Sequence, residues 1–155
     1  MFRTTVIAVA LALSVGAQAA GAQDLTKGTT PASVRVRYMV NDVAASVAFY
    51  KDNLGFKLDL QSGPYFAALS RGGVQLLLSP TKGPGGASQP MPDGQRPTPG
   101  GWNRIVIYTT DLKGDVERLR KAGVRFRNDI VVGLGGNEIL LDDPSGNSVE
   151  LFQPS

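Results

Sequence analysis

The chain has 155 residues and contains no cysteine and no histidine. Without cysteine it cannot form disulfides, thiolate nucleophiles or cysteine-based metal sites. Without histidine it lacks the commonest general base and the commonest metal ligand of proteins. Any chemistry in this chain must therefore use Asp, Glu, Tyr, Ser, Lys or Arg.

Strong or clustered charge is also missing. The formal net charge is +3, and the basic residues are scattered along the chain. Proteins that bind nucleic acid usually present a clustered basic face, so we expect no nucleic-acid partner. The hydrophobic fraction of 42% and the charged fraction of 19% are those of a folded globular protein, and the length fits one domain.

No apolar run is long enough to span a bilayer, which takes about 17–25 residues. The apolar run at 6–15 follows the basic Arg3 and precedes two small-residue triplets, at 17–19 and 20–22. This order is typical of a secretory signal, and its shortness disfavours the alternative of an uncleaved anchor helix. We expect residues 1–22 to be removed, with cleavage after the second triplet favoured over the first. The mature protein would then be periplasmic or secreted, with no membrane span.

One nine-residue pattern, with Arg at its first position and Asp at its eighth, occurs twice in the chain. It runs from Arg35 to Val43 and again, 69 positions later, from Arg104 to Leu112. Each copy leads into an amphipathic stretch that stops at a glycine, Gly55 in the first and Gly123 in the second. A self-match at a fixed period is the signature of a repeated structural unit. The sequence therefore predicts two copies of one module.

Each module has the pattern of a strand, a helix and three further strands. Asp42 and Asp111 stand where helix caps are expected, and apolar residues follow them at helical spacing. Gly55 and Gly123 supply the left-handed residue that commonly ends a helix. The predicted strands are 34–40, 56–61, 65–70 and 74–79 in module one, and 102–109, 124–132, 137–141 and 148–153 in module two.

The remaining segments separate these modules from the rest of the chain. Residues 23–33 are aperiodic and are expected to be a flexible lead-in. Residues 34–154 would form a single domain, made of module one (34–79), a Pro- and Gly-rich loop (80–101) and module two (102–154). A loop of this length within a compact domain is usually functional or disordered, so it is either a linker or a lid over a site.

Side-chain alternation predicts which residues of the first strands face a site. Arg35 and Arg37 lie on one face of the first strand, and Tyr38 lies on the other face with apolar neighbours. The apolar face suits packing under the helix, which leaves the arginine face for a cleft. By the repeat, Arg104 and Tyr108 face the same cleft from module two.

The two modules also carry recognisable motifs. These are Asn41-Asp42-Val43 with Phe49-Tyr50 and Leu54-Gly55-Phe56, and the ending Asp143-Pro144-Ser145-Gly146-Asn147-Ser148-Val149-Glu150-Leu151. On these motifs and the repeat, the chain resembles the vicinal oxygen chelate superfamily, which includes glyoxalase I, bleomycin-resistance proteins, fosfomycin-resistance proteins and extradiol dioxygenases. The resemblance covers nearly all of 34–154. It implies an α+β fold in which two βαβββ modules form a curved mixed sheet with a concave cleft, and it specifies no reaction.

Members of this family that hold a metal ion place its ligands on the first and last strands of each module. Carried over by register, these positions are Arg35, Leu76, Arg104 and Glu150, of which only Glu150 is a metal ligand. A guanidinium has donors only and repels a cation. The resemblance therefore implies a site that has lost its metal, and we expect no metal and no cofactor.

The same residues suggest a binding site. If Arg35, Arg104 and Glu150 converge in one cleft, one positive charge is left in excess, which suits a small anionic or polar organic molecule. Aromatic side chains and the Pro/Gly-rich loop would form its walls. The predicted ligand-binding residues are Arg35, Arg37, Leu76, Trp102, Arg104, Tyr108, Glu150 and Phe152.

Two alternatives stay open beside ligand binding. In one, Arg35, Glu150 and Arg104 form a salt bridge that closes a non-catalytic relic site. In the other, the chain is a metal-free enzyme of the lyase, isomerase or dioxygenase-like kind, with Glu150 as its catalytic general base. An arginine neighbour favours the ionised carboxylate and makes it a poorer base. The cleft can be built within one chain or shared across a homodimer.

Five further charged residues are expected to have no functional role, among them Asp93, which lies in the Pro- and Gly-rich loop. Asp142 and Asp143 lie in a turn, where their side chains are expected to bond the nearby backbone. Arg125 and Arg127 alternate on one predicted strand and are expected to be solvated.

Overall fold

The computed structural model describes residues 34–155. The predicted signal sequence at 1–22 and the lead-in at 23–33 lie outside the described residues, so both stay predictions. Among the helices of the described part, none is long and apolar enough to cross a membrane.

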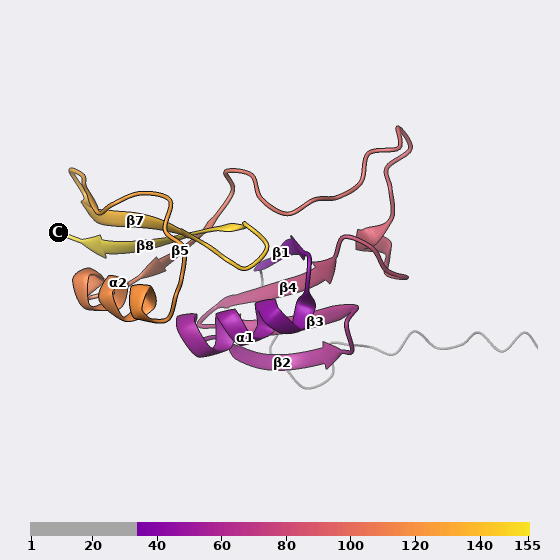
Figure 1. Cartoon of the computed structure of the whole chain (residues 1–155), viewed down its shortest axis with the longest axis horizontal. Coiled ribbons are helices and arrows are strands. Elements are labelled where there is room, and N and C mark those ends of the chain that lie inside the picture. Colours follow the sequence, from indigo (N-terminus) through magenta and orange to yellow (C-terminus); the bar gives the residue numbers. More distant parts are fainter. Residues whose placement is uncertain (1–33) are drawn as a thin grey trace, which may run out of the picture. The chain divides into compact units, whose positions relative to one another are not determined.

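The first module forms a four-stranded sheet with one helix packed on it (Figure 1). Its elements are β1 (Val34–Val40), α1 (Val43–Leu54), β2 (Lys57–Ser62), β3 (Phe66–Arg71) and β4 (Val74–Pro80). The strand order is β1-β4-β3-β2, with β1 parallel to β4 and the other pairs antiparallel. A parallel neighbour needs a long crossover connection, which α1 and the β2–β3 hairpin supply.

The second module repeats this arrangement. Its elements are β5 (Ile105–Tyr108), α2 (Leu112–Lys121), β6 (Val131–Val132), β7 (Gly136–Asp142) and β8 (Ser148–Pro154). The strand order is β5-β8-β7-β6, with β5 parallel to β8. The α+β class and the two βαβββ modules are thus confirmed. Within residues 34–155 each module keeps its own sheet, and no ladder joins the edge strands β1 and β5.

Both helices begin and end as the sequence predicts. The Asp42 carboxylate accepts a hydrogen bond from the Ala45 N–H at 3.0 Å, and the Asp111 carboxylate accepts one from the Gly114 N–H at 3.0 Å. Gly55 closes α1 with a φ of 67°, a conformation that side chains disfavour. These local signals were sufficient because each involves residues only a few positions apart.

Two predicted strands are shorter in the structure. The first strand of module two was predicted from residue 102 but begins at Ile105. The strand predicted at 124–132 is ordered as β6 only at its last two residues. Before β6 the chain still follows β7, where the Arg127 N–H bonds the Leu140 carbonyl. The side chain of Asn128 then accepts the Leu140 N–H at 2.8 Å, which takes the place of a backbone acceptor and interrupts the ladder.

The inward faces of the two modules share one hydrophobic core. The predicted alternation along β1 is confirmed, since Tyr38 and Val40 are buried while Arg35 and Arg37 are exposed. Buried apolar residues from both helices and both sheets form a single cluster. The open faces of the sheets, which carry the polar residues, are therefore held in place by one core.

The hydroxyl of Tyr38 links module one to the backbone of module two. It accepts the N–H of Ile105 on β5 at 3.0 Å and donates to the carbonyl of Ser148 on β8 at 3.0 Å. The hydroxyl thus bridges two backbone groups at the start of the β5–β8 pair. Burial raises the pKa of this hydroxyl, so it stays protonated and able to donate.

The turn between β7 and β8 forms the second half of this connection. Asp143 accepts the hydroxyl of Tyr50, from α1, at 3.1 Å. Asn147 donates from its side-chain amide to the carbonyl of Met39 on β1 at 2.9 Å. Ser145 accepts the N–H of Asn41 at 2.9 Å. The turn predicted from residues 142–147 therefore also joins the modules.

The loop at 80–101 is irregular apart from a short 3₁₀ helix, η1 (Gly86–Ser88). The buried Ser88 hydroxyl donates to the carbonyl of Pro80, and near the other end the Gly100 N–H donates to Asn147 at 2.8 Å. In Figure 1 the loop leaves β4 and returns to β5 on an extended course. Its proposed role as a lid stays a prediction.

We expect Tyr38→Phe to destabilise the protein by about 1–3 kcal/mol, because it leaves a part-buried N–H and a buried carbonyl without their common partner. Tyr65→Phe is the matched control, since Tyr65 is half exposed. Urea unfolding midpoints measure both variants. Equal midpoints for the two would show that the Tyr38 hydroxyl does not stabilise the joint.

Candidate ligand-binding site

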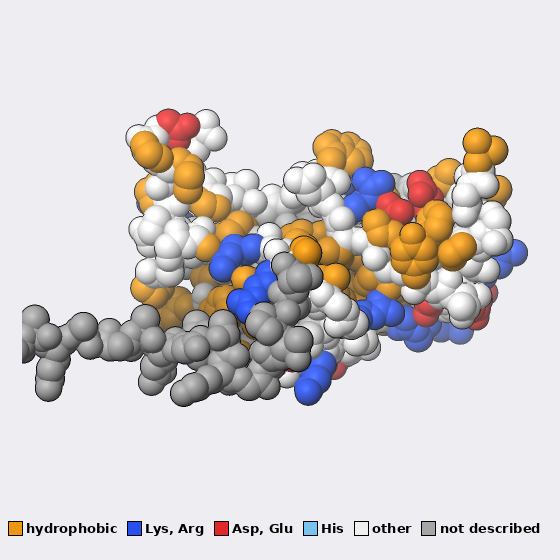
Figure 2. All heavy atoms as spheres, turned by 180° about the vertical axis from the view of Figure 1, so that it is seen from behind, with side chains coloured by type: hydrophobic (Ala, Val, Ile, Leu, Met, Phe, Trp, Pro, Cys, Tyr) orange, Lys and Arg blue, Asp and Glu red, His pale blue; other side chains and the backbone are white. Residues whose placement is uncertain are grey.

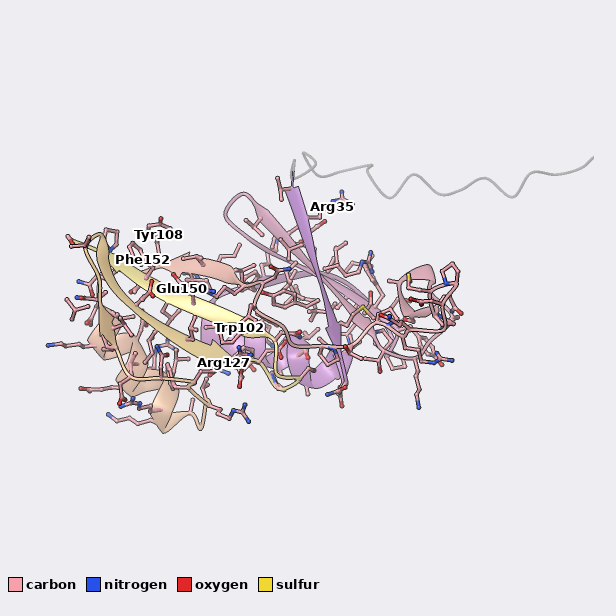
Figure 3. The ribbon with its side chains drawn as sticks, turned by 90° about the horizontal axis from the view of Figure 1, so that it is seen from above. Arg35, Trp102, Tyr108, Arg127, Glu150 and Phe152 are labelled. Atoms are coloured by element: carbon pink, nitrogen blue, oxygen red, sulfur yellow. The ribbon has the colours of Figure 1, made fainter. Side chains whose placement is uncertain are left out.

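The open face of the module-two sheet is the face opposite the core. Val149 and Leu151 of β8 are buried in the core, so Glu150 and Phe152 point the other way. The register pairs Val106 with Glu150 and Tyr108 with Phe152, which brings these four residues onto one face. Figure 3 shows Tyr108, Phe152 and Glu150 following one another along this sheet.

At the centre of the open face, Arg104 pairs with Glu150. The Arg104 Nε lies 2.5 Å from the Glu150 Oε2, and the carboxylate side chain is only 8% exposed. A buried carboxylate needs a compensating partner, and Arg104 supplies it. The pair carries no net charge.

Arg35 and Arg37 lie elsewhere, on the open face of the module-one sheet. Arg35 is opposite Gln75 in the β1–β4 pair, and Arg37 donates to the Ser79 hydroxyl at 2.5 Å. Figure 3 places Arg35 on β1, apart from Glu150. No ion pair joins Arg35 to Glu150 within the described chain. The expected convergence of Arg35, Glu150 and Arg104 is therefore not formed here, because their strands belong to two sheets.

The structure also corrects the register assigned to β4. Leu76 is fully buried in the core, so its side chain faces away from the open face. Arg37 pairs with Leu77, just as the equivalent Val106 pairs with Glu150. The position that corresponds to Glu150 is thus Leu77. The sequence offered no turn or insertion to distinguish these neighbouring leucines, and a slip of one residue reverses the face.

Aromatic side chains share this face with the Arg104–Glu150 pair. Tyr108 is 67% exposed and packs edge-on against Phe152, with ring centroids 5.3 Å apart. Trp102, just before β5, is 76% exposed. Apolar side chains also reach the surface of the second module beside charged groups (Figure 2). This face therefore combines aromatic area with one charge-balanced polar pair.

A cavity of about 350 Å³ lies beside β5, where the second module meets the β3–β4 turn. Val106 and Tyr108 line it from module two, and Arg71 and Val74 line it from module one. It gives the edge of the open face a recess with one basic side chain.

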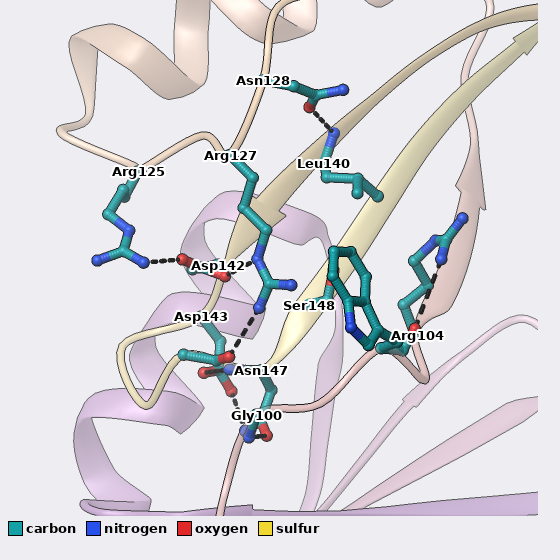
Figure 4. A network of polar contacts seen from close by, with 12 residues as sticks. Gly100, Arg104, Arg125, Arg127, Asn128, Leu140, Asp142, Asp143, Asn147 and Ser148 are labelled. Atoms are coloured by element: carbon teal, nitrogen blue, oxygen red, sulfur yellow. Dashed lines mark hydrogen bonds and ion pairs between the residues drawn. The ribbon is translucent and has the colours of Figure 1, made fainter.

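The structure reveals a polar network that the sequence interpretation missed. The Asp142 side chain is 4% exposed and lies between two arginines, with Arg127 Nε at 2.6 Å from one oxygen and Arg125 Nη2 at 2.6 Å from the other. Figure 4 shows both arginines directed at this carboxylate. Arg127 is thus a fixed side chain rather than a solvated one. The alternation of the two arginines was visible in the sequence, but their acidic partner on β7 was not.

The residues at the family's metal positions do not fit a metal ion. With the register corrected they are Arg35, Leu77, Arg104 and Glu150, and the single carboxylate among them is bonded to a guanidinium. Elsewhere in residues 34–155, no group of three or more Asp, Glu, His or Cys side chains is placed to hold a metal. The donor set on this face suits hydrogen bonding to a polar group better than coordination.

Comparisons with known proteins agree with this architecture. A family model described as Glyoxalase/Bleomycin resistance protein/Dioxygenase superfamily matches residues 33–151. No curated protein sequence matches the chain. The crystal structure of a lactoylglutathione lyase from Agrobacterium tumefaciens is 19% identical, with a TM-score of 0.60, and the match covers 81% of this chain and 96% of that one.

Two further solved structures have the same fold. TnmS3, an antibiotic binding protein from Streptomyces sp. CB03234, is 24% identical with a TM-score of 0.60, covering 78% of this chain and 93% of that chain. A glyoxalase/bleomycin resistance protein/dioxygenase from Nocardioides is 23% identical with a TM-score of 0.61, covering 85% and 89%. At these identities the structures establish the fold alone, whereas the family model spans most of the sequence. The chain belongs to the glyoxalase/bleomycin resistance protein/dioxygenase superfamily.

Proposed function

We propose that this protein binds a small polar or anionic organic molecule on the open face of its module-two sheet, without a metal ion. The observation that carries the proposal is the Arg104–Glu150 pair, which stands at metal-ligand positions of the family and shares its face with exposed aromatic rings. Such a mixture of aromatic area and few polar groups is typical of small-molecule sites. That a protein of similar fold is named an antibiotic binding protein supports a binding role.

The geometry indicates how a polar ligand would be held. Arg104 uses its Nε for Glu150 and keeps outward N–H groups, since its side chain is one third exposed. A carbonyl, carboxylate or phosphate oxygen can accept from these groups. Arg71, in the cavity beside β5, adds a positive charge that the neutral Arg104–Glu150 pair does not supply. A ligand with an acidic group and an apolar body matches this arrangement.

A catalytic role for Glu150 is less well supported. The guanidinium of Arg104 occupies its carboxylate, and the Glu150 side chain is only 8% exposed, so little of the carboxylate can reach a proton of a bound substrate. Binding needs only the contacts already present on this face.

Ligand binding predicts a rise in the thermal midpoint when aromatic carboxylates or phosphates are added. A ligand at a hundredfold excess over its Kd stabilises the folded state by about 2.7 kcal/mol, which raises the midpoint by several degrees. We expect the double variant Arg104→Gln/Glu150→Gln to lose most of the rise, since it removes the ion pair without leaving a buried charge alone. Arg96→Gln, in the exposed loop, is the control. The idea fails if no compound shifts the wild type, or if the double variant responds like the control.

Metal independence predicts that chelation leaves binding unchanged. The sample is the protein recovered from the exported fraction, where we expect an N-terminus directly after Ala19 or Ala22. Elemental analysis is expected to find far less than one metal ion per chain, and EDTA to leave the ligand-induced midpoint shift as it was. Stoichiometric metal that is required for binding would contradict the assignment.

The open faces also predict a homodimer, as the second part of the proposal. Trp102, Val106 and Tyr108 expose apolar area on one face, and such patches commonly mark interaction sites. A second copy would cover this area and close the site from above. Sedimentation equilibrium is expected to give twice the chain mass for the wild type and a lower mass for Val106→Glu, with Val132→Glu on β6 as the control. A monomeric wild type would restrict the site to one chain.

A further inference from the structure

Trp102 is the only tryptophan of the chain, and most of its surface is in contact with solvent. It lies beside the open face, next to Arg127 in Figure 3. A large apolar ring left in water is unfavourable by itself. One charged side chain nevertheless packs against this ring.

Arg127 lies over the indole ring. Its guanidinium carbon is 5.9 Å from the Trp102 ring centroid, within the range of a cation–π contact. The guanidinium is itself held on two sides, because its Nε donates to Asp142 at 2.6 Å and its Nη2 donates to the Gly146 carbonyl at 3.0 Å. An arginine fixed by two bonds loses little further freedom when it supports a ring.

The anchor of this arrangement is Asp142. Its carboxylate is almost fully buried at the end of β7, so the loss of Arg127 would leave a buried charge with Arg125 as its remaining ion-pair partner. Arg125 approaches the other oxygen from the solvent side, where its own side chain is 79% exposed. The two arginines therefore share one partner (Figure 4). Arg127 also lies over the tryptophan ring.

The backbone of Trp102 also contacts the Arg104–Glu150 pair of the proposed site. An Nη1 of Arg104 lies 3.5 Å from the Trp102 carbonyl, while Arg104 Nε is bonded to Glu150. Arg127 thus contacts the ring, and Arg104 contacts the backbone of the same residue. Both arginines are paired with carboxylates, but their remaining N–H groups can only donate, which favours a neutral or anionic molecule that offers an acceptor.

We propose that Trp102 is a stacking subsite for a planar conjugated ring, and that Arg127, anchored by Asp142, is the positioning residue that fixes the orientation of the indole ring. This inference rests on the proposed function and names the ligand class more closely: a flat aromatic body that bears a neutral or acidic group. The indole supplies the stacking surface, and Arg104 lies close enough to bind the polar group of the same molecule.

The unique tryptophan allows the support to be tested without any ligand. We expect Arg127→Gln to lower the steady-state fluorescence anisotropy of Trp102 and to increase its quenching by acrylamide, because the indole ring loses its contact with the guanidinium. Arg125→Gln, which removes the other guanidinium from the same carboxylate, is expected to leave both values unchanged. Arg127→Lys keeps a cation beside Asp142 and secures a folded variant for the comparison; a lysine cannot make both bonds, so an intermediate change is expected.

Stacking is tested with naphthalene-2-carboxylate and its saturated, non-planar counterpart, decahydronaphthalene-2-carboxylate, by titration calorimetry. We expect the aromatic probe to bind the wild type about tenfold more tightly, which corresponds to about 1.4 kcal/mol. Trp102→Leu is expected to abolish this preference, Arg127→Gln to reduce it about fivefold, and Arg125→Gln to change it less than twofold.

The outcomes separate this inference from the proposed function. Equal binding of the two probes by the wild type would overturn the stacking subsite and leave small-molecule binding standing. Anisotropy and preference that do not change in Arg127→Gln would overturn the positioning role. If neither probe binds the wild type, the stacking subsite fails together with the proposed site, even if the anisotropy change shows that Arg127 supports the ring.

Discussion

The hydroxyl of Tyr38 is the contact on which the arrangement of the two modules depends. It bonds both the N–H of Ile105 and the carbonyl of Ser148, so a side chain from β1 occupies the place where β5 and β8 begin their pairing. Leaving a part-buried N–H and a buried carbonyl without partners would be costly. The start of β5, and with it Arg104 and Trp102, is therefore positioned by module one.

The turn that follows β7 reinforces the same joint. Asn147 reaches Met39 on β1 and also accepts the N–H of Gly100, which is two residues before Trp102. Asp143, beside it, is bonded to Tyr50 of α1. One turn thus connects the first sheet, the first helix and the end of the long loop, and it stands at the edge of the proposed site.

Buried charge organises the open face itself. Glu150 and Asp142 are both nearly inaccessible. Glu150 is paired with Arg104, and Asp142 is paired with Arg125 and Arg127. An unpaired carboxylate at either place would be strongly unfavourable, so the arginines are held in defined positions. Between these two pairs lies Trp102. The same electrostatic requirement that neutralises the face also makes it a poor metal site and orients its largest aromatic ring.

Whether a feature of the fold or of the site could be predicted from the sequence depended on how far apart in the chain the interacting residues are. Asp42, Gly55 and Asp111 interact with residues a few positions away, so caps, helices and the repeat could be predicted, together with the inward and outward faces of β1 and β5. The site itself was predicted only in part. The neighbouring strands β5 and β8 bring together Arg104, Glu150, Tyr108 and Phe152, as predicted. Arg35 instead belongs to the other sheet, and Leu77 rather than Leu76 faces outward. Arg127 forms an ion pair with an aspartate on β7 that the sequence did not indicate. These relations are decided by strand register and by which segments become neighbours in space, and the tertiary structure sets both through packing of the shared core.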